Sequence, residues 1–501
     1  MTNCRIFNIL AYYFFKMEVK NPYMYNGETM TPKIGSLNVG TKSVYIESFG
    51  CAMNFSDSEI VLSILNDINY KNTNDMFNAD LILINTCSIR EKAELTVRKR
   101  LEKFNKVKTK NKNIKIGVLG CMAERLKHKL LEEEKIVDLV VGPDAYKDLP
   151  NLLEEVSDGH TAVNVLLSKD ETYSDINPVR LNPNGVSAFV SITRGCDNMC
   201  TFCVVPFTRG RERSRDPQSI INELIDLRKK NYKEVTLLGQ NVDSYLWYGG
   251  GLKKDFSKAS EIQKASSINF AKLLEMCALA VPEMRIRFST SNPQDMSLDV
   301  IKKVAKYKNI CNYIHLPVQS GSDKILKLMN RQHTIKDYLK LIDNINNEIP
   351  NCGISHDMIV GFPNETESDH EETLKLMDKV KYSFGYMFKY SERPGTLAAK
   401  KFDDNVDEIV KSRRLSEIIS LQQKHSLFRN KQYMNDVVEV LIEKESKKSK
   451  SKWAGRNQQN TTVVFPKENY KIGDFVNVRI NNYTSATLIG EAVNYSKNNI
   501  L

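Results

Sequence analysis

The sequence has no long hydrophobic run. Spanning a bilayer takes about 18 or more consecutive apolar residues, and the apolar stretch at residues 6–15 is shorter and is interrupted by Asn8. A secretory signal would also need a small-residue cleavage site, and we identify no convincing one after this stretch. We therefore expect a cytoplasmic protein with no membrane partner, and we interpret residues 1–40 as a disordered or loosely attached tail.

Cysteine is also scarce. Ten cysteines in 501 residues are too few for a disulfide scaffold, and their grouping favours metal binding in a reducing cytosol. A phosphate-binding loop is missing as well, because the glycine run at residues 249–251 has neither the lysine nor the strand that such a loop needs. We expect residues 249–267 to form a flexible surface insertion.

Charge and length set further bounds. The chain has 72 Lys and Arg residues against 61 Asp and Glu residues, which gives a net charge of +11. A basic excess suits a polyanionic partner, with nucleic acid as the first candidate. At about 150 residues per domain, the length allows about three domains, and we expect a monomer.

Three closely spaced thiols lie in the middle of the chain. Cys196, Cys200 and Cys203 have a C-x3-C-x2-C spacing on one short loop. Thiolates this close can face one metal centre, and soft sulfur ligands favour an iron–sulfur cluster or zinc. Structural zinc usually takes four protein ligands, but this loop offers three thiols and no histidine. A three-thiolate cluster with one open iron is the better hypothesis, and inert buried thiols are the alternative.

The region 41–167 alternates strand-like and helical patterns, which indicates a parallel α/β domain. The predicted strands are residues 43–49, 80–85, 114–119 and 137–141. The predicted helices begin at Ser56, with Glu59 as a capping-box partner, and cover about residues 93–107 and 123–134.

Three further cysteines follow strands of this domain. Cys51, Cys87 and Cys121 each come just after a predicted strand. Because the carboxyl ends of parallel strands share one edge of a sheet, we expect these thiols to meet at one rim. Glycines at positions 50 and 120 allow tight turns there. The sequence thus predicts a second three-thiolate cluster, with unrelated buried thiols as the alternative. The remaining cysteines show no pattern: Cys4, Cys277, Cys311 and Cys352.

A second domain is predicted at residues 186–433, after a linker rich in Asn and Pro at about 168–185. Six strand-like runs separated by helical patterns indicate a six-unit partial (βα) barrel, short of the eight units of a closed TIM barrel. The runs are residues 187–193, 234–238, 285–289, 313–318, 354–360 and 384–390. The loop with Cys196 follows the first of them, at the rim where such folds hold their chemistry.

Polar residues follow the other strands of this domain. As a ring they are plausible hydrogen-bond partners for a ligand, although each alone is better explained by a strand-to-helix turn. They are Gln240, Asn241, Ser291, Asn292, Gln319 and Ser320.

Four arginines follow the cysteine loop: Arg209, Arg211, Arg213 and Arg215. They could contact RNA phosphates, or they could pair with acidic neighbours such as Glu212 and Asp216. The sequence leaves these two explanations about even.

Residues 434–497 read as short alternating β runs after a long helical segment at about 407–433. This pattern is typical of a small β-barrel of the oligonucleotide-binding kind. The segment 447–456 is strongly basic and contains Trp453, so we interpret it as a loop that contacts RNA phosphates and bases. A solvated loop that aids solubility is the alternative.

The motifs together resemble a known family. The cysteine loop, with Phe202 just before its last cysteine, is similar to the signature of radical S-adenosylmethionine (SAM) enzymes. Residues 43–495 resemble the methylthiotransferases, in which a three-cysteine domain precedes a radical SAM domain and an RNA-binding TRAM domain. The motifs at residues 193–212, 239–242, 315–322 and 390–396 are similar to the branch that acts on N6-isopentenyladenosine in tRNA. At Asn292 many members have histidine, and we expect no loss of function from this departure.

The resemblance implies two 4Fe-4S clusters and SAM as cofactors. One cluster, held by Cys196, Cys200 and Cys203, would cleave SAM to a 5′-deoxyadenosyl radical. The second, held by Cys51, Cys87 and Cys121, would deliver the sulfur. The implied contacts with SAM are Phe202, Gln240, Asn241 and Gln319.

The reaction implied by the resemblance is methylthiolation of carbon 2 of an isopentenylated adenosine next to the anticodon of tRNA. The implied electron donor is a protein such as flavodoxin or ferredoxin. Two alternatives remain open. One keeps the chemistry but acts on threonylcarbamoyl-adenosine or on a ribosomal protein side chain. The other is a non-catalytic RNA-binding metalloprotein.

Overall fold

The computed structural model describes residues 41–87, 91–181 and 185–493. The predicted tail at residues 1–40, Cys4 and the last residues of the predicted third domain lie outside the described residues. From Lys42 onward the described chain belongs to one compact unit. None of the helices in this part of the chain is long and apolar enough to cross a membrane.

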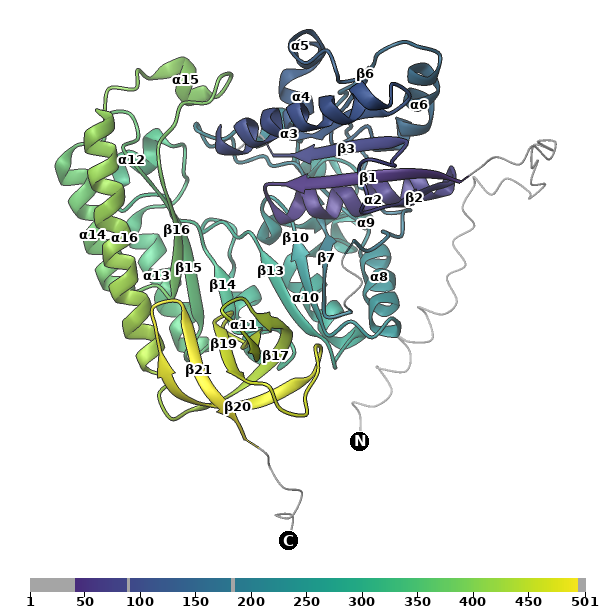
Figure 1. Cartoon of the computed structure of the whole chain (residues 1–501). Coiled ribbons are helices and arrows are strands. Elements are labelled where there is room, and N and C mark those ends of the chain that lie inside the picture. Colours follow the sequence, from purple (N-terminus) through teal and green to yellow (C-terminus); the bar gives the residue numbers. More distant parts are fainter. Residues whose placement is uncertain (1–40, 88–90, 182–184, 494–501) are drawn as a thin grey trace. The chain divides into compact units, whose positions relative to one another are not determined.

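The first sheet is parallel throughout, in the order β2-β1-β3-β4-β5-β6 (Figure 1). Its central strand β3 is fully buried, as its continuous apolar run predicts for a strand covered on both faces. The strands are β1 (Lys42–Phe49), β2 (Tyr70–Asn72), β3 (Leu81–Thr86), β4 (Lys115–Gly120), β5 (Leu139–Val141) and β6 (Ala162–Asn164). The parallel α/β architecture predicted for this region is confirmed.

Helices cover both faces of this sheet. Leu65 and Leu149 belong to the apolar core on one face, and Phe104 and Leu130 belong to the core on the other. The helices are α2 (Ala52–Asp67), α3 (Glu91–Lys110), α4 (Cys121–Leu126), α5 (His128–Glu133) and α6 (Leu149–Ser157), with a 3-10 turn η1 (Tyr146–Asp148).

Two predicted helix boundaries in this domain are wrong. Helix α2 begins at Ala52 rather than Ser56, because Gly50 turns the chain with a φ of +106° directly after β1. Ser56 and Glu59 are therefore buried inside the helix, and Glu59 forms no capping box. The helix predicted at 123–134 is broken in two at Lys127, which has a φ of +51°.

The second domain contains two three-stranded parallel sheets, β13-β10-β7 and β14-β15-β16. A parallel bridge between Ile286 and Ile310 links them. The strands are β7 (Ser187–Ser191), β10 (Glu234–Leu238), β13 (Arg285–Ser289), β14 (Tyr313–His315), β15 (Gly353–Val360) and β16 (Phe384–Lys389). The predicted partial barrel of six strands is thus confirmed, although β14 ends three residues earlier than predicted.

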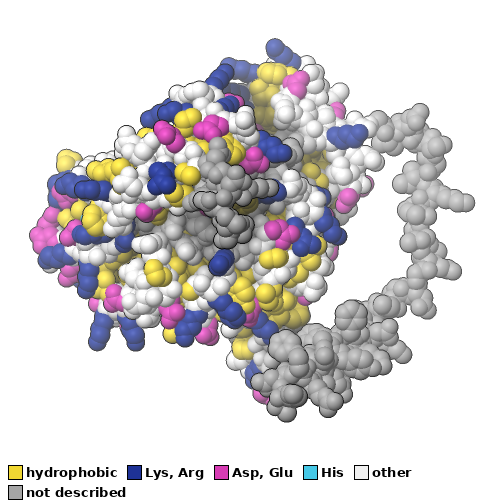
Figure 2. Space-filling model, turned by 90° about the horizontal axis from the view of Figure 1, so that it is seen from below, with side chains coloured by type: hydrophobic (Ala, Val, Ile, Leu, Met, Phe, Trp, Pro, Cys, Tyr) yellow, Lys and Arg dark blue, Asp and Glu magenta, His cyan; other side chains and the backbone are white. Residues whose placement is uncertain are grey.

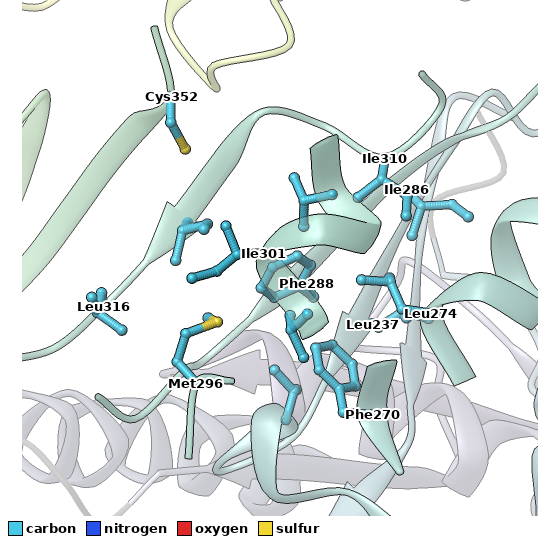
Figure 3. Close-up of a cluster of buried hydrophobic side chains, with 14 of the residues drawn as sticks. Leu237, Phe270, Leu274, Ile286, Phe288, Met296, Ile301, Ile310, Leu316 and Cys352 are labelled. Atoms are coloured by element: carbon cyan, nitrogen blue, oxygen red, sulfur yellow. The ribbon is translucent and has the colours of Figure 1, made fainter. Parts of the chain in front are cut away.

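Helices follow these strands and close the outer side. Phe270 and Phe288 pack edge to face at 5.3 Å in the core between helices and sheet (Figure 3), and each buried ring of this kind contributes about 1.5–3 kcal/mol. The longer helices are α8 (Pro217–Lys229), α10 (Phe270–Ala280), α11 (Leu298–Lys306), α13 (Ile335–Glu348), α14 (Glu367–Val380) and α16 (Glu408–Lys431). Shorter ones are α7 (Val205–Thr208), α9 (Glu261–Ala265), α12 (Asp323–Leu328) and α15 (Leu397–Lys401).

Two segments predicted as irregular are structured. The predicted insertion contains a 3-10 helix η3 (Lys253–Lys258) and helix α9, which Ser260 caps. Strands β11 (Leu246–Trp247) and β12 (Ile268–Asn269) pair across its ends. In the predicted linker, Tyr173 is buried and stacks on Tyr146 of the first domain. The linker is therefore packed against the first domain rather than free.

The C-terminal strands form a closed barrel in the order β17-β18-β19-β21-β20. They are β17 (Val437–Ser446), β18 (Ser449–Arg456), β19 (Thr462–Pro466), β20 (Phe475–Tyr483) and β21 (Thr487–Ala492). The predicted basic loop 447–456 is mostly β18, so that expectation is corrected: its lysines alternate along a strand. Figure 2 shows Lys and Arg side chains scattered among Asp and Glu on the face seen from below, without one dominant basic patch.

The barrel contacts the amino ends of β10 and β13. Arg287 of β13 donates to the backbone carbonyl of Asn457 at 2.7 Å, and Arg456 pairs with the buried Glu234 at 2.9 Å. Arg456 is therefore engaged in the protein and is not a free phosphate ligand. The barrel lies at the edge of the sheet opposite to the carboxyl ends, where the cysteine loop begins.

Candidate functional site

The order of strands in the first sheet changes direction at β1. The next strand along the chain, β2, lies on one side of β1, and β3 lies on the other. Such a switch point opens a crevice beyond the carboxyl ends of the strands. Cys51 follows β1 as the N-cap of α2, Cys87 follows β3, and Cys121 follows β4 as the first residue of α4. The structure therefore places all three thiols at this rim. Cys51 is exposed, whereas the other two are buried.

Glycine is required at two places on the rim. A Cβ atom at Gly50 would lie 2.3 Å from the Cβ atom of Cys87, and one at Gly120 would lie 2.3 Å from Oδ1 of Asn85. Both glycines also have positive φ, which other residues rarely adopt. They let the cysteine-bearing turns approach one another closely.

The local environment shifts the pKa values of two thiols of this rim in opposite directions. A hydrogen bond with Cys87 lowers the pKa of the Cys51 thiol to about 6. Burial raises the pKa of the Cys121 thiol, and the Arg209 guanidinium opposes that effect. The thiolate is the form that binds metal, and of these two thiols Cys51 is the more readily ionised.

The second set of thiols lies on the loop between β8 (Thr193–Arg194) and α7. Gly195 turns the chain into this loop, and Arg331 donates to the sulfur of Cys200 at 3.6 Å. Burial, followed by the nearby Cys200, raises the pKa of Cys203 to about 12. A bound cation is what would offset such burial and favour the thiolate.

The two sets of cysteines meet through Arg209, which follows α7. Its Nε donates to the sulfur of Cys121 at 3.2 Å, and its Nη2 donates to Asn54 and Asp57, each at 2.8 Å. Arg209 therefore connects the cysteine loop of the second domain with the cysteine rim of the first. The field of Cys121 also reaches Cys203 and contributes to raising its pKa.

Asp57 is the centre of a buried ionic network. It accepts from Arg194 at 2.9 Å as well as from Arg209, and it has no exposed side-chain surface. Burial alone would raise its pKa, but the two guanidiniums lower it. Asp144, just after β5, likewise faces Arg194 and Arg213. Arginines of the second domain thus insert into acidic sites of the first and fix the two rims against each other.

The residues predicted to contact SAM lie in two places. Gln240 and Asn241 follow β10, and each has a buried side-chain oxygen without a hydrogen-bond partner among the described residues. Asn241 also donates to Asp295 at 2.6 Å. Unpaired buried oxygens are costly, so these atoms are suited to a ligand donor. Asn292 offers a third such oxygen.

The other two predicted contacts have structural partners. Phe202 packs against an apolar cluster that includes Ile325, Phe362 and Tyr390. Gln319 has a φ of +79°, and its backbone bridges to β15. Phe202 is itself part of the cysteine loop, and Gln319 anchors the strand end through its backbone.

Comparisons with known proteins cover nearly the whole described chain. Family models match the radical SAM superfamily at residues 190–377, the uncharacterized protein family UPF0004 at 43–142 and the TRAM domain at 431–493. A tRNA-2-methylthio-N(6)-dimethylallyladenosine synthase from Christiangramia forsetii is 70% identical over 92% of this chain and 95% of its own length. One from Karelsulcia muelleri is 56% identical over 90% of this chain and 99% of its own.

The chain belongs to the tRNA-2-methylthio-N(6)-dimethylallyladenosine synthase family. Among solved structures, the radical SAM methyltransferase TsrM from Kitasatospora setae matches with a TM-score of 0.52, covering 72% of this chain and 75% of its own at 13% identity. At that identity the likeness supports the fold alone. Membership of the radical SAM superfamily implies a 4Fe-4S cluster and SAM in this family member.

The structure decides between the two explanations for the arginines after the cysteine loop. All four pair with carboxylates, and three of them are buried. Their partners are Asp57 for Arg209, Asp197 for Arg211, Asp144 for Arg213 and Glu223 for Arg215. They are not the neighbours Glu212 and Asp216, so sequence proximity does not identify the acids.

Asp57, Asp144 and Arg194 are site residues that the sequence reasoning missed. The only feature of the sequence that indicates them is a charged residue within a segment expected to be buried. Asp57, for example, lies within α2, which is buried along most of its length. A carboxylate is almost never fully buried unless it is paired. Such a residue therefore predicts a buried partner, although it does not identify that partner.

Proposed function

We propose that this protein attaches a methylthio group to carbon 2 of N6-isopentenyladenosine next to the anticodon of tRNA. The observation that carries the proposal is that Arg209, six residues after the last cysteine of the loop, donates to the sulfur of Cys121 in the other domain. Membership of the synthase family supports the reaction and the tRNA substrate. Because tRNA is modified in the cytoplasm, the proposal places the protein there.

Six cysteines would hold the two clusters. Cys196, Cys200 and Cys203 are the candidates for the radical SAM cluster, and Cys51, Cys87 and Cys121 for the second. When bound, these groups and SAM supply the radical chemistry that an inert aromatic C–H bond requires. The protein supplies the thiolates and the hydrogen bonds from Arg209 and Arg331 to sulfur.

The cysteine arrangement is compatible with 4Fe-4S clusters. In the described residues, no three Cys, His, Asp or Glu side chains are placed to hold one metal ion between them. In a 4Fe-4S cluster each thiolate binds a different iron, so the sulfurs need not converge on one point. The glycines at positions 50 and 120 allow the turns of the first rim to lie close together, because a Cβ atom at either position would collide with a neighbouring residue.

The RNA would also contact the C-terminal barrel. Lys447 and Lys448 form the exposed turn between β17 and β18, and Lys467 lies 4.4 Å from the ring of Trp453. Because Lys467 also pairs with Glu445, the exposed Lys447 and Lys448 are the candidates for the phosphate backbone, and Trp453 is the candidate for a stacked base. This surface replaces the arginines after the cysteine loop as the candidate for phosphate contact.

The test is nucleoside analysis after anaerobic reconstitution with tRNA that carries the isopentenyl group. The wild type should form the methylthio product. Cys200→Ala should form neither product nor 5′-deoxyadenosine, whereas Cys87→Ala should lose the product and keep some cleavage of SAM. Cys352→Ala, which removes a buried thiol of the core, is the control and should retain the product. Product formed equally well on tRNA without the isopentenyl group would contradict the assigned substrate.

A further inference from the structure

An aromatic face lies inside the partial barrel, on strand β16. Phe384, Tyr386 and Phe388 alternate along this strand and so point to one side of the sheet. In the described residues β16 pairs only with β15, which makes it an edge strand. The register places Tyr386 opposite Asp357 and Phe388 opposite Ile359.

This side of the sheet faces the cysteine loop. Ile359 packs in the apolar cluster that includes Phe202, next to Cys203. The other side belongs to the outer helices, since His356 hydrogen-bonds Gln422 of α16 at 2.9 Å. The aromatic residues of β16 therefore line the inner face of the partial barrel.

The rings hold one another in place. Tyr313 of β14 stacks on Phe384 with ring centroids 5.7 Å apart and an interplanar angle of 8°. Tyr386 meets Phe384 edge to face at 6.0 Å and His315 at 5.8 Å. Such pairs are worth about 0.5–1.5 kcal/mol beyond the area they bury. Tyr386 is thus positioned by two neighbouring rings.

Tyr386 nevertheless remains 50% exposed, while Tyr313 is only 7% exposed. In a closed barrel, inward side chains fill the interior and leave no such ring open. The buried oxygens suited to SAM, on Gln240 and Asn241, follow a different strand. A half-exposed ring inside the barrel is therefore available for a planar, apolar partner.

The aromatic face extends from the RNA-binding barrel toward the cysteine loop. At one end Tyr313 pairs in register with Gly353 of β15, which packs against the backbone of Gln459 in the barrel. At the other end Phe388 lies beside Ile359, in the cluster around Phe202. The aromatic face therefore lies between the C-terminal barrel and the cysteine rim. RNA that contacts the barrel and delivers a base to the rim would pass along it.

We propose that Tyr386 is a stacking site for an unstacked nucleobase of the RNA substrate. Single-stranded loops are recognised by stacking splayed bases on aromatic side chains, and an adenosine that undergoes chemistry must leave its stack. This inference rests on the proposed function for the identity of the RNA. It adds the residue that receives a base on the inner face of the barrel.

The experiment measures binding of an isopentenylated anticodon stem-loop RNA to the reconstituted full-length protein. Loss of one stacked base weakens binding about 5- to 160-fold, as for alanine substitutions at other stacking sites. We expect Tyr386→Leu to weaken binding by that factor and Tyr386→Phe to retain it within about twofold. The matched control is Phe428→Leu, a 47% exposed ring on the outer helix α16, and its affinity should not change.

A second readout reports stacking directly. A set of stem-loop RNAs would each carry 2-aminopurine at one loop position. For one of these positions, the fluorescence should fall when the RNA binds the wild type or Tyr386→Phe. Tyr386→Leu should leave that position bright at saturating protein. Unchanged affinity and quenching in Tyr386→Leu, or an equal loss in Phe428→Leu, would overturn the inference. A wild type that binds and quenches but forms no methylthio product would instead contradict the proposed function.

Discussion

Neutralising Asp57 gives the sharpest test of the buried network between the two cysteine rims. In Asp57→Asn, Arg194 and Arg209 keep their charges but lose the carboxylate that receives a hydrogen bond from each, at 2.9 and 2.8 Å. Removing one partner of a buried ion pair costs about 3–5 kcal/mol. We expect the lower part of that range, because Arg194 retains Asp144 at 3.6 Å and the carbonyl of Pro143 at 2.8 Å.

The assay is urea or thermal unfolding of the metal-free protein, with Asp226→Asn as the matched control. Asp226 pairs with Lys230 on the surface of α8, and exposed pairs contribute about 0–1 kcal/mol. A loss below about 1 kcal/mol in Asp57→Asn, or a loss equal to that of the control, would refute the reasoning.

The stability difference between the wild type and Asp57→Asn should depend on pH, in a direction set by the sign of the pKa shift of Asp57. The pKa of Asp57 is lowered in the folded protein, so its contribution is fully present above the unfolded pKa of about 3.9. The contribution is lost only as the pH falls through the lower folded pKa. The difference between wild type and Asp57→Asn should therefore stay constant between about pH 5 and 8 and shrink below about pH 4.

Three further predictions concern the site and its support. Gly120→Ala should destabilise the first domain by about 1–3 kcal/mol, because φ is +86° and ψ is −155° there, a region that almost only glycine occupies. Urea unfolding measures this loss of stability. The control Gly159→Ala, with positive φ but no neighbour within 4 Å, should cost less. Arg209→Lys keeps the charge but loses the planar set of donors, so the ratio of methylthio product to 5′-deoxyadenosine should fall while SAM cleavage persists; an unchanged ratio would contradict the role given to its bond with Cys121. Glu234→Gln removes the buried charge that Arg456 contacts and should speed proteolysis between α16 and β17; an unchanged cleavage rate would contradict its part in holding the C-terminal barrel.

Local patterns predicted the fold well where they are strong. The apolar run of β3 and the spacing of Cys51, Cys87 and Cys121 follow from the alternation of strand and helix, and parallel topology brings their ends to one edge. The start of α2 was missed, because Ser56 and Glu59 imitate a capping box while the turn at Gly50 begins the helix earlier. Sequence shows the capping residues, but only the fold shows whether they are buried.

Long-range partners could not be predicted. The arginines after the cysteine loop suggested both RNA contact and ion pairing, and the acids that receive Arg209 and Arg213 lie more than 60 residues away in sequence, at Asp57 and Asp144. The pattern at residues 447–456 predicts a loop because lysine is a poor strand former, whereas pairing within the closed barrel makes most of this segment strand β18. The candidate cysteines themselves were apparent from spacing alone.

The most direct test of the central claim counts clusters by Mössbauer spectroscopy and iron analysis on anaerobically reconstituted protein. The account predicts roughly eight irons per chain in two 4Fe-4S sites for the wild type, and roughly four in a single site for Cys87→Ala and for Cys200→Ala. Two sites in the wild type with distinct signals, each lost in one variant, would agree with the account. A single site in the wild type that survives in either variant, or zinc in place of iron, would contradict it.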